Sequence, residues 1–189
     1  MKKLCLILLS LIFIFTMSCN NEEAPEGNGE NETATNEAVI FNTSDEMVEA
    51  AKEQIEEVPV AKLKEMMDAE ETFLLLDVRM AAEFNKGYIL GSVNIPRGVL
   101  EFRINKESFW EDEMLYLPKK EDLIIILCKK GHRGSLATVT LQSMGFSNVK
   151  NLEGGFTAYK EAYPDGVEIP EVAEGDIPAE GGEEDDGGC

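Results

Sequence analysis

Two apolar runs without alternation dominate the middle of the chain. Residues 73–78 and 122–127 are almost continuously apolar. Strands that are covered on both faces show such runs, because neither face meets water. The sequence therefore predicts two central strands of a parallel sheet.

Shorter segments around these runs predict the remaining elements. The other strand candidates are residues 58–60, 92–95 and 148–150. The helix candidates are residues 61–67, 81–85, 135–144 and 156–162. Pro59 restricts its strand to a sheet edge, because proline donates no backbone hydrogen bond. Since strands and helices alternate, we expect an α/β fold with a parallel sheet of about five strands.

An amphipathic segment precedes this alternating pattern. Thr43 and Glu46 have the spacing of a capping box, and apolar residues follow them at helical intervals. We expect an N-terminal helix over 43–57 that packs on a core formed by 58–163. Together these parts make one domain over 43–164, and we expect it to be a monomer.

Both flanks of this domain have a different composition. Residues 20–38 and 165–189 are rich in carboxylates and contain no Lys or Arg. Such segments cannot bury enough apolar surface to offset the entropy lost on ordering. We expect a disordered acidic tether over 19–42 and a disordered acidic tail over 165–189.

The first residues have the pattern of an export signal. Lys2 and Lys3 precede an apolar run over 4–17, which is shorter than the roughly 20 residues that a membrane-spanning helix needs. The small residues before Cys19 resemble the lipobox of bacterial lipoproteins. This resemblance implies that 1–18 is a signal peptide, that Cys19 is lipidated, and that the protein is extracytoplasmic and held on a bacterial membrane by its lipid alone. A short uncleaved anchor and an ordinary secretory signal are the alternatives.

Charge and histidine content exclude two classes of function. The chain has 17 Lys and Arg residues against 37 Asp and Glu residues, for a net charge of −20. A nucleic-acid phosphate backbone would be repelled by such a surface, so we expect no nucleic-acid partner. With 1 His in the chain there is no imidazole cluster to bind zinc or copper, so we expect no metal site.

The second apolar run ends in a segment that can carry chemistry. Cys128 follows the predicted strand, and the next residues are Lys129, Lys130, Gly131, His132, Arg133 and Gly134. Ligands of open α/β sheets bind beyond the carboxyl ends of such strands. The two glycines let backbone N–H groups turn inward, and the helix that we expect to begin near Gly134 adds its positive end.

This setting favours the thiolate of Cys128 over the thiol. A cysteine after an apolar strand is commonly only a small core residue. Here, however, basic neighbours would be costly to bury with it, so the local pattern indicates a reactive cysteine.

Several blocks of the chain resemble the rhodanese family. The blocks are residues 75–84, 87–96, 128–134 and 144–156, in the family's order. The resemblance implies a doubly wound domain with helices on both faces of the sheet. It also implies that Cys128 takes a sulfane sulfur from a small anionic donor such as thiosulfate. The resulting persulfide would pass its sulfur to a thiol, a protein or cyanide, with no cofactor besides this covalent intermediate.

The resemblance also implies roles for the neighbours of Cys128. The backbone from Lys129 to Gly134 would cradle the outer sulfur, and Lys129, Lys130 and Arg133 would attract anionic donors. We expect His132 to line the mouth of the pocket.

Three more residues match the family pattern at a distance from this loop. Asp77, Arg79 and Glu83 are expected to support the loop through hydrogen bonds and ion pairs rather than to transfer protons. Gly134 departs from the pattern, because the family often has Ser or Ala there, and the hydroxyl of Ser135 is a possible substitute.

Two other functions remain open at this point. Cysteine phosphatases and arsenate reductases also place a thiolate at a helix start, but their loops resemble Cys, five residues and then Arg. Here four residues separate Cys128 from Arg133. The other alternative is a non-catalytic rhodanese-like binding module, although such modules commonly lack the cysteine.

Overall fold

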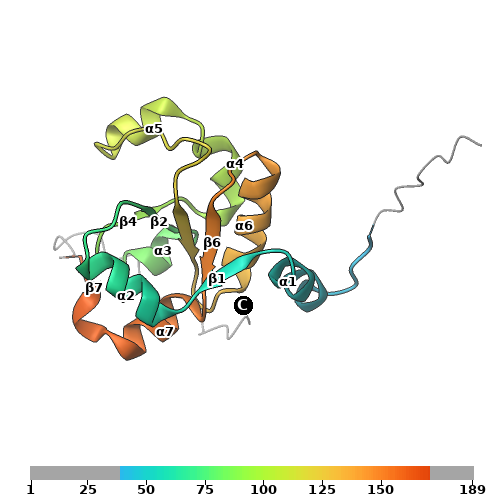
Figure 1. The fold of residues 1–189 in the computed structure, drawn as a ribbon, viewed down its shortest axis with the longest axis horizontal. Helices are drawn as coiled ribbons and strands as arrows, with labels where there is room; N and C mark the ends of the chain where they lie inside the picture. Colours follow the sequence, from blue (N-terminus) through green and yellow to red (C-terminus); the bar gives the residue numbers. More distant parts are fainter. Residues whose placement is uncertain (1–38, 171–189) are drawn as a thin grey trace, which may run out of the picture. The chain divides into compact units, whose positions relative to one another are not determined.

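Five parallel strands form the central sheet of the computed structural model, which describes residues 39–170 (Figure 1). The strands are β1 (Glu56–Val58), β2 (Leu74–Asp77), β4 (Ser92–Asn94), β5 (Ile124–Leu127) and β6 (Val149–Leu152). Their order is β1-β6-β5-β2-β4, and every neighbouring pair is parallel. The predicted parallel α/β sheet is confirmed.

Helices cover both faces of this sheet (Figure 1). They are α1 (Ser44–Lys52), α2 (Val60–Asp68), α3 (Ala81–Phe84), α4 (Leu100–Arg103), α5 (Glu107–Asp112), α6 (His132–Ser143) and α7 (Gly155–Ala162). One buried cluster joins the sheet to α4, α5 and α6, and a second joins it to α2 and α7. The doubly wound arrangement therefore divides the core into two layers.

Strand β5 shows why the apolar runs lack alternation. Ile124 and Ile126 belong to the first buried cluster, whereas Ile125 and Leu127 belong to the second. All four side chains are fully buried. A strand between two helical layers has no solvent face, so the period-two pattern disappears. The prediction that 122–127 forms a central strand is confirmed.

Helix α1 begins where the sequence predicts. The Thr43 hydroxyl accepts a hydrogen bond from the Glu46 backbone N–H at 3.2 Å. The Glu46 carboxylate, however, accepts from the Asn42 N–H at 2.7 Å, one residue earlier than in a capping box. The apolar stripe buries Val48 and Ala51, and α1 packs on α6.

The predicted helix over 43–57 is too long. It ends at Lys52, and residues 56–58 form the edge strand β1. Pro59 disfavours a helical conformation at Val58, and an extended chain there gains parallel pairing with β6. The predicted strand over 58–60 is shifted for the same reason, because Pro59 is the N-cap of α2.

The acidic tail does not begin at residue 165 as predicted. A 3-10 turn (Pro164–Gly166) leads into β7 (Val167–Glu168), which pairs antiparallel with β3 (Tyr88–Ile89). Val167 packs against the second buried cluster, which stabilises this pairing despite the acidic composition.

Other predictions concern residues outside the described part of the chain. These are the signal peptide over 1–18, the lipidated Cys19, the tether up to residue 38, and the tail from residue 171. Within 39–170, no helix is both long enough and apolar enough to cross a bilayer.

Candidate functional site

Cys128 lies directly after β5, at the carboxyl edge of the sheet. Its side chain is fully buried and its thiol is free. The backbone N–H of Gly131 donates to the Cys128 Sγ at 3.2 Å. A buried N–H donor aimed at this sulfur stabilises negative charge on it.

Gly131 makes the short turn from β5 into α6. Its φ is +98°, which is in the left-handed region that favours glycine, and it is the N-cap of α6. Its carbonyl accepts from the Ser135 N–H at 2.8 Å and from the Ser135 hydroxyl at 3.1 Å. The helix therefore begins at His132, earlier than the segment predicted from the sequence.

This early start places the predicted loop residues in the first turn of α6. His132, Arg133 and Gly134 are helical. N–H groups in the first turn of a helix have no intrahelical acceptor, and the helix dipole adds positive potential there. Ser135 directs its hydroxyl to the Gly131 carbonyl, so it does not replace a hydroxyl at position 134 beside the sulfur.

The first residue of α7, Gly155, lies directly against the Cys128 loop. A Cβ on Gly155 would lie 2.4 Å from the Cys128 carbonyl oxygen and 2.9 Å from the Gly131 nitrogen. The next residue, Phe156, donates its N–H to the Cys128 carbonyl at 2.8 Å. The sequence matched this segment to the family without indicating a role for it, although paired glycines close to the end of a strand are a signal of close backbone approach.

A buried ion pair lies at the end of β2. Arg79 Nη2 is 2.6 Å from Asp77 Oδ2, and the side chains are 3% and 0% exposed. Burial raises the pKa of the Asp77 carboxyl, and the contact with Arg79 opposes that shift. The guanidinium also donates to the Gly87 carbonyl at 2.9 Å and lies 3.8 Å above the Phe156 ring. Arg79 therefore connects β2 to the start of α7.

A second ion pair joins α3 to the first turn of α6. Arg133 Nη1 and Nη2 bind the two Glu83 carboxylate oxygens at 2.7 Å and 2.9 Å. The hydrogen bond from Arg133 lowers the pKa of Glu83. The resemblance implies that the Arg133 charge attracts anionic donors. In the structure this charge is paired with the Glu83 carboxylate. Lys129 and Lys130 are both exposed.

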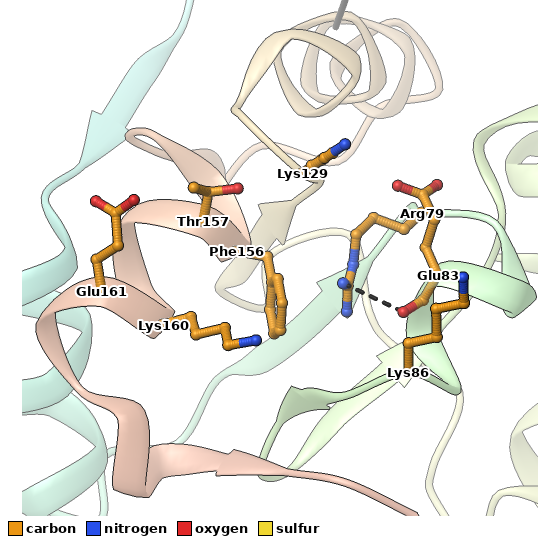
Figure 2. Close-up of a pocket in the computed structure, with 8 residues that line it drawn as sticks. All are labelled: Arg79, Glu83, Lys86, Lys129, Phe156, Thr157, Lys160 and Glu161. Carbon is orange, nitrogen blue, oxygen red and sulfur yellow. Dashed lines mark hydrogen bonds between the residues drawn. The ribbon is translucent and has the colours of Figure 1, made fainter. Parts of the chain in front are cut away.

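A cavity of about 620 Å³ lies beside the Cys128 loop. Its lining residues are Arg79, Glu83, Lys86, Lys129, Phe156, Thr157, Lys160 and Glu161 (Figure 2). The structure thus brings three of the predicted site residues to one cavity. Neither Cys128 nor His132 is among the lining residues of this cavity. Within 39–170, no three His, Cys, Asp or Glu residues are placed to bind a metal ion.

Asn151 explains why position 134 is glycine. It is fully buried, and its amide nitrogen donates to the Gly131 carbonyl at 3.2 Å and to the Ser135 hydroxyl at 3.1 Å. The same nitrogen donates to Glu57 at 2.7 Å. A Cβ on Gly134 would lie 2.2 Å from the Asn151 Oδ1. Asn151 therefore occupies the space that a side chain at position 134 would need.

We expect Gly134→Ala to destabilise the domain by about 1–3 kcal/mol, because the hydrogen bonds of the Asn151 amide nitrogen resist the shift that would make room for a Cβ. Gly98→Ala is the matched control, because a Cβ there meets nothing within 4 Å. Urea unfolding measures both changes. In the double variant Gly134→Ala/Asn151→Ala the clash is absent, so its cost should be smaller than the sum of the single costs. Additive costs would contradict this packing.

Residues 59–162 match the family model described as a rhodanese-like domain. The Bacillus subtilis protein YrkF is 33% identical over 101 residues, which is 53% of this chain and 49% of YrkF, so the chain spans about half of that relative. A sulfurtransferase of Allochromatium vinosum is 28% identical over 105 residues, covering 56% of this chain and 88% of the relative.

Solved structures show the same fold. A Rhodopseudomonas palustris protein of unknown function, described as a possible tyrosine phosphatase, has a TM-score of 0.55 and 29% identity over 66% of this chain and 94% of its own. The human single-domain sulfurtransferase TSTD1 has a TM-score of 0.51 and 30% identity over 55% of this chain and 94% of its own.

Proposed function

The chain belongs to the rhodanese-like domain family, and from this premise we propose that it is a sulfurtransferase that carries a sulfane sulfur on Cys128. One observation carries the proposal: a buried Cys128 Sγ at the carboxyl end of β5 accepts the Gly131 N–H at 3.2 Å, beside the start of α6. A family relative is named a sulfurtransferase, which supports the same class of reaction.

In the loading step, the Cys128 thiolate attacks the outer sulfur of thiosulfate. The S–S bond of the donor breaks, and sulfite leaves with the bonding electron pair. The product is a Cys128 persulfide, so charge and sulfur both balance. Lys129 and Lys130 attract the anionic donor.

In the discharge step, an acceptor thiolate or cyanide attacks the outer sulfur of the persulfide. The persulfide S–S bond breaks and Cys128 leaves as the thiolate, ready for another cycle. The Gly131 N–H and the helix start stabilise negative charge on sulfur throughout. Complete burial of the Cys128 side chain shields its own sulfur from water.

The structure offers less support for phosphate chemistry. A phosphatase would direct its loop arginine at the phosphoryl oxygens, whereas Arg133 binds both carboxylate oxygens of Glu83. Four residues between Cys128 and Arg133 also make a short loop. A small cradle suits one sulfur atom better than a tetrahedral group.

The test is sulfur transfer by the full chain. Thiosulfate and cyanide should give thiocyanate, and thiosulfate alone should add the mass of one sulfur at Cys128. Hydrolysis of a phosphate ester without any sulfur gain would support the phosphatase instead. Absence of both activities would indicate a non-catalytic binding module.

We also propose that the protein is an extracytoplasmic lipoprotein anchored through Cys19. The support is the sequence: basic Lys2 and Lys3, a short apolar run and small residues before Cys19. Cys19→Ser should move the protein from the detergent phase to the aqueous phase and leave it unlipidated. A variant that stays in the detergent phase and keeps Met1 would show an uncleaved anchor instead.

A further inference from the structure

Three lysines from separate segments line the cavity beside the Cys128 loop. Lys86 follows α3, Lys129 follows Cys128, and Lys160 lies in α7. No ion pair within residues 39–170 involves any of these three ammonium groups. Figure 2 shows the Lys160 side chain extending toward the Phe156 ring.

The other charged groups of the cavity are largely neutralised. Arg79 is paired with Asp77, and Glu83 is paired with Arg133. Glu161 is the remaining carboxylate among the lining residues, so one negative charge faces the three lysine charges. A local excess of positive charge is unusual in a chain of net charge −20. Such a concave site attracts anions and raises their local concentration.

The cavity has room for a ligand larger than thiosulfate or cyanide. Its volume of about 620 Å³ falls within the range of roughly 300–1,000 Å³ that is typical of pockets for organic ligands. The Phe156 ring supplies an apolar surface for a carbon skeleton, and the lysines supply partners for carboxylates.

The cavity also borders the loop that begins at Cys128. Lys129 belongs to both, and the Phe156 N–H donates to the Cys128 carbonyl at 2.8 Å. We propose that this cavity is the acceptor subsite of the sulfurtransferase, and that the acceptor is a small thiol that carries two carboxylates. Lys86 and Lys160 are its specificity-determining residues. This inference rests on the proposed persulfide chemistry.

The reaction at this subsite is the discharge step with a thiolate acceptor. The thiolate of the dicarboxylate attacks the outer persulfide sulfur, a new S–S bond forms on the acceptor, and the Cys128–sulfur bond breaks. Cys128 leaves with the electron pair as the thiolate. No oxidant or reductant is needed, because the sulfane sulfur is passed on with its oxidation state unchanged.

The test isolates discharge from loading. The full chain is loaded with thiosulfate and freed of excess donor. Loss of the added sulfur from Cys128 is then followed by mass with two thiols: mercaptosuccinate, which has two carboxylates, and uncharged 2-mercaptoethanol. The variant is Lys86→Gln/Lys160→Gln. Its thermal melting is compared with that of the parent, because both lysines are exposed and should not affect folding.

We expect the variant to lose about 10-fold in rate constant for mercaptosuccinate, since two charge-assisted contacts are removed, and less than about 2-fold for 2-mercaptoethanol. For each thiol, the rate constant of the variant is divided by that of the parent. The intrinsic nucleophilicity of the thiol cancels in this ratio. Lys106→Gln/Lys119→Gln is the matched control, because it removes the same charge outside the cavity. It should leave both ratios near one.

The outcomes separate this inference from the proposed function. Equal losses on both thiols, no loss on either, or the same loss in the control variant would overturn the subsite while leaving sulfur transfer in place. Failure of Cys128 to load from thiosulfate or any other sulfane-sulfur donor would refute the sulfurtransferase itself, and the subsite with it.

Discussion

Cys128→Ser is expected to abolish sulfur transfer completely while leaving the fold in place. The serine hydroxyl is similar in size to the thiol, so the buried position after β5 and the approach of the Gly131 N–H remain. At neutral pH the hydroxyl stays protonated, so it neither attacks a sulfane sulfur nor holds one afterwards. Thiocyanate formation and the one-sulfur mass gain should both disappear.

Cys189→Ser is the matched control for this prediction. Cys189 follows Glu183, Glu184, Asp185 and Asp186, whose negative charges disfavour a thiolate, and no apolar run precedes it in the sequence. We expect this variant to turn over at the parent rate. Turnover by Cys128→Ser at the parent rate would show that the persulfide forms elsewhere. A collapse of turnover in Cys189→Ser with loading retained would show that Cys189 resolves the intermediate.

Arg79→Met is expected to destabilise the domain by about 3–5 kcal/mol, which is the usual cost of breaking a buried ion pair. Asp77 is fully buried, and Arg79 is its cationic partner at 2.6 Å. Methionine fills part of the space but leaves a carboxyl group without a counter-charge. The same change removes the stacking on Phe156, so persulfide loading should also fall.

The loss of stability in Arg79→Met should depend on pH. Burial raises the pKa of Asp77, and Arg79→Met removes the contact that opposes the shift. The native variant then binds a proton more readily than its unfolded chain. Its stability relative to the parent should therefore fall as the pH rises from about 4 toward neutrality.

A second variant distinguishes the ion pair from simple loss of packing. Asp77→Asn/Arg79→Met keeps an oxygen that can accept the backbone N–H of residue 79, but no buried charge remains. Urea unfolding should show it to be more stable than Arg79→Met alone. If Arg79→Met costs less than about 1 kcal/mol, or if the double variant is less stable than the single one, the pair does not stabilise this site.

The apolar pattern of the chain predicted two interior strands of the sheet. Strands β2 and β5 lie within the runs 73–78 and 122–127, because a strand covered on both faces has no polar face. Element boundaries near Pro59 and after residue 165 were predicted less well. There, local propensity competes with long-range pairing to β6 and β3, which the sequence pattern does not reveal.

The sequence by itself indicated where an anion would bind: one cysteine joins a buried strand to a glycine-containing loop with basic residues, and this pattern favours an anion at the edge of the sheet. Only the tertiary structure decided which partners each group has. It directs Arg133 to Glu83, Asn151 to the space beside Gly134, and three lysines to one cavity. These contacts join segments that lie far apart in the chain, and side-chain pairing across such distances depends on packing rather than on local pattern.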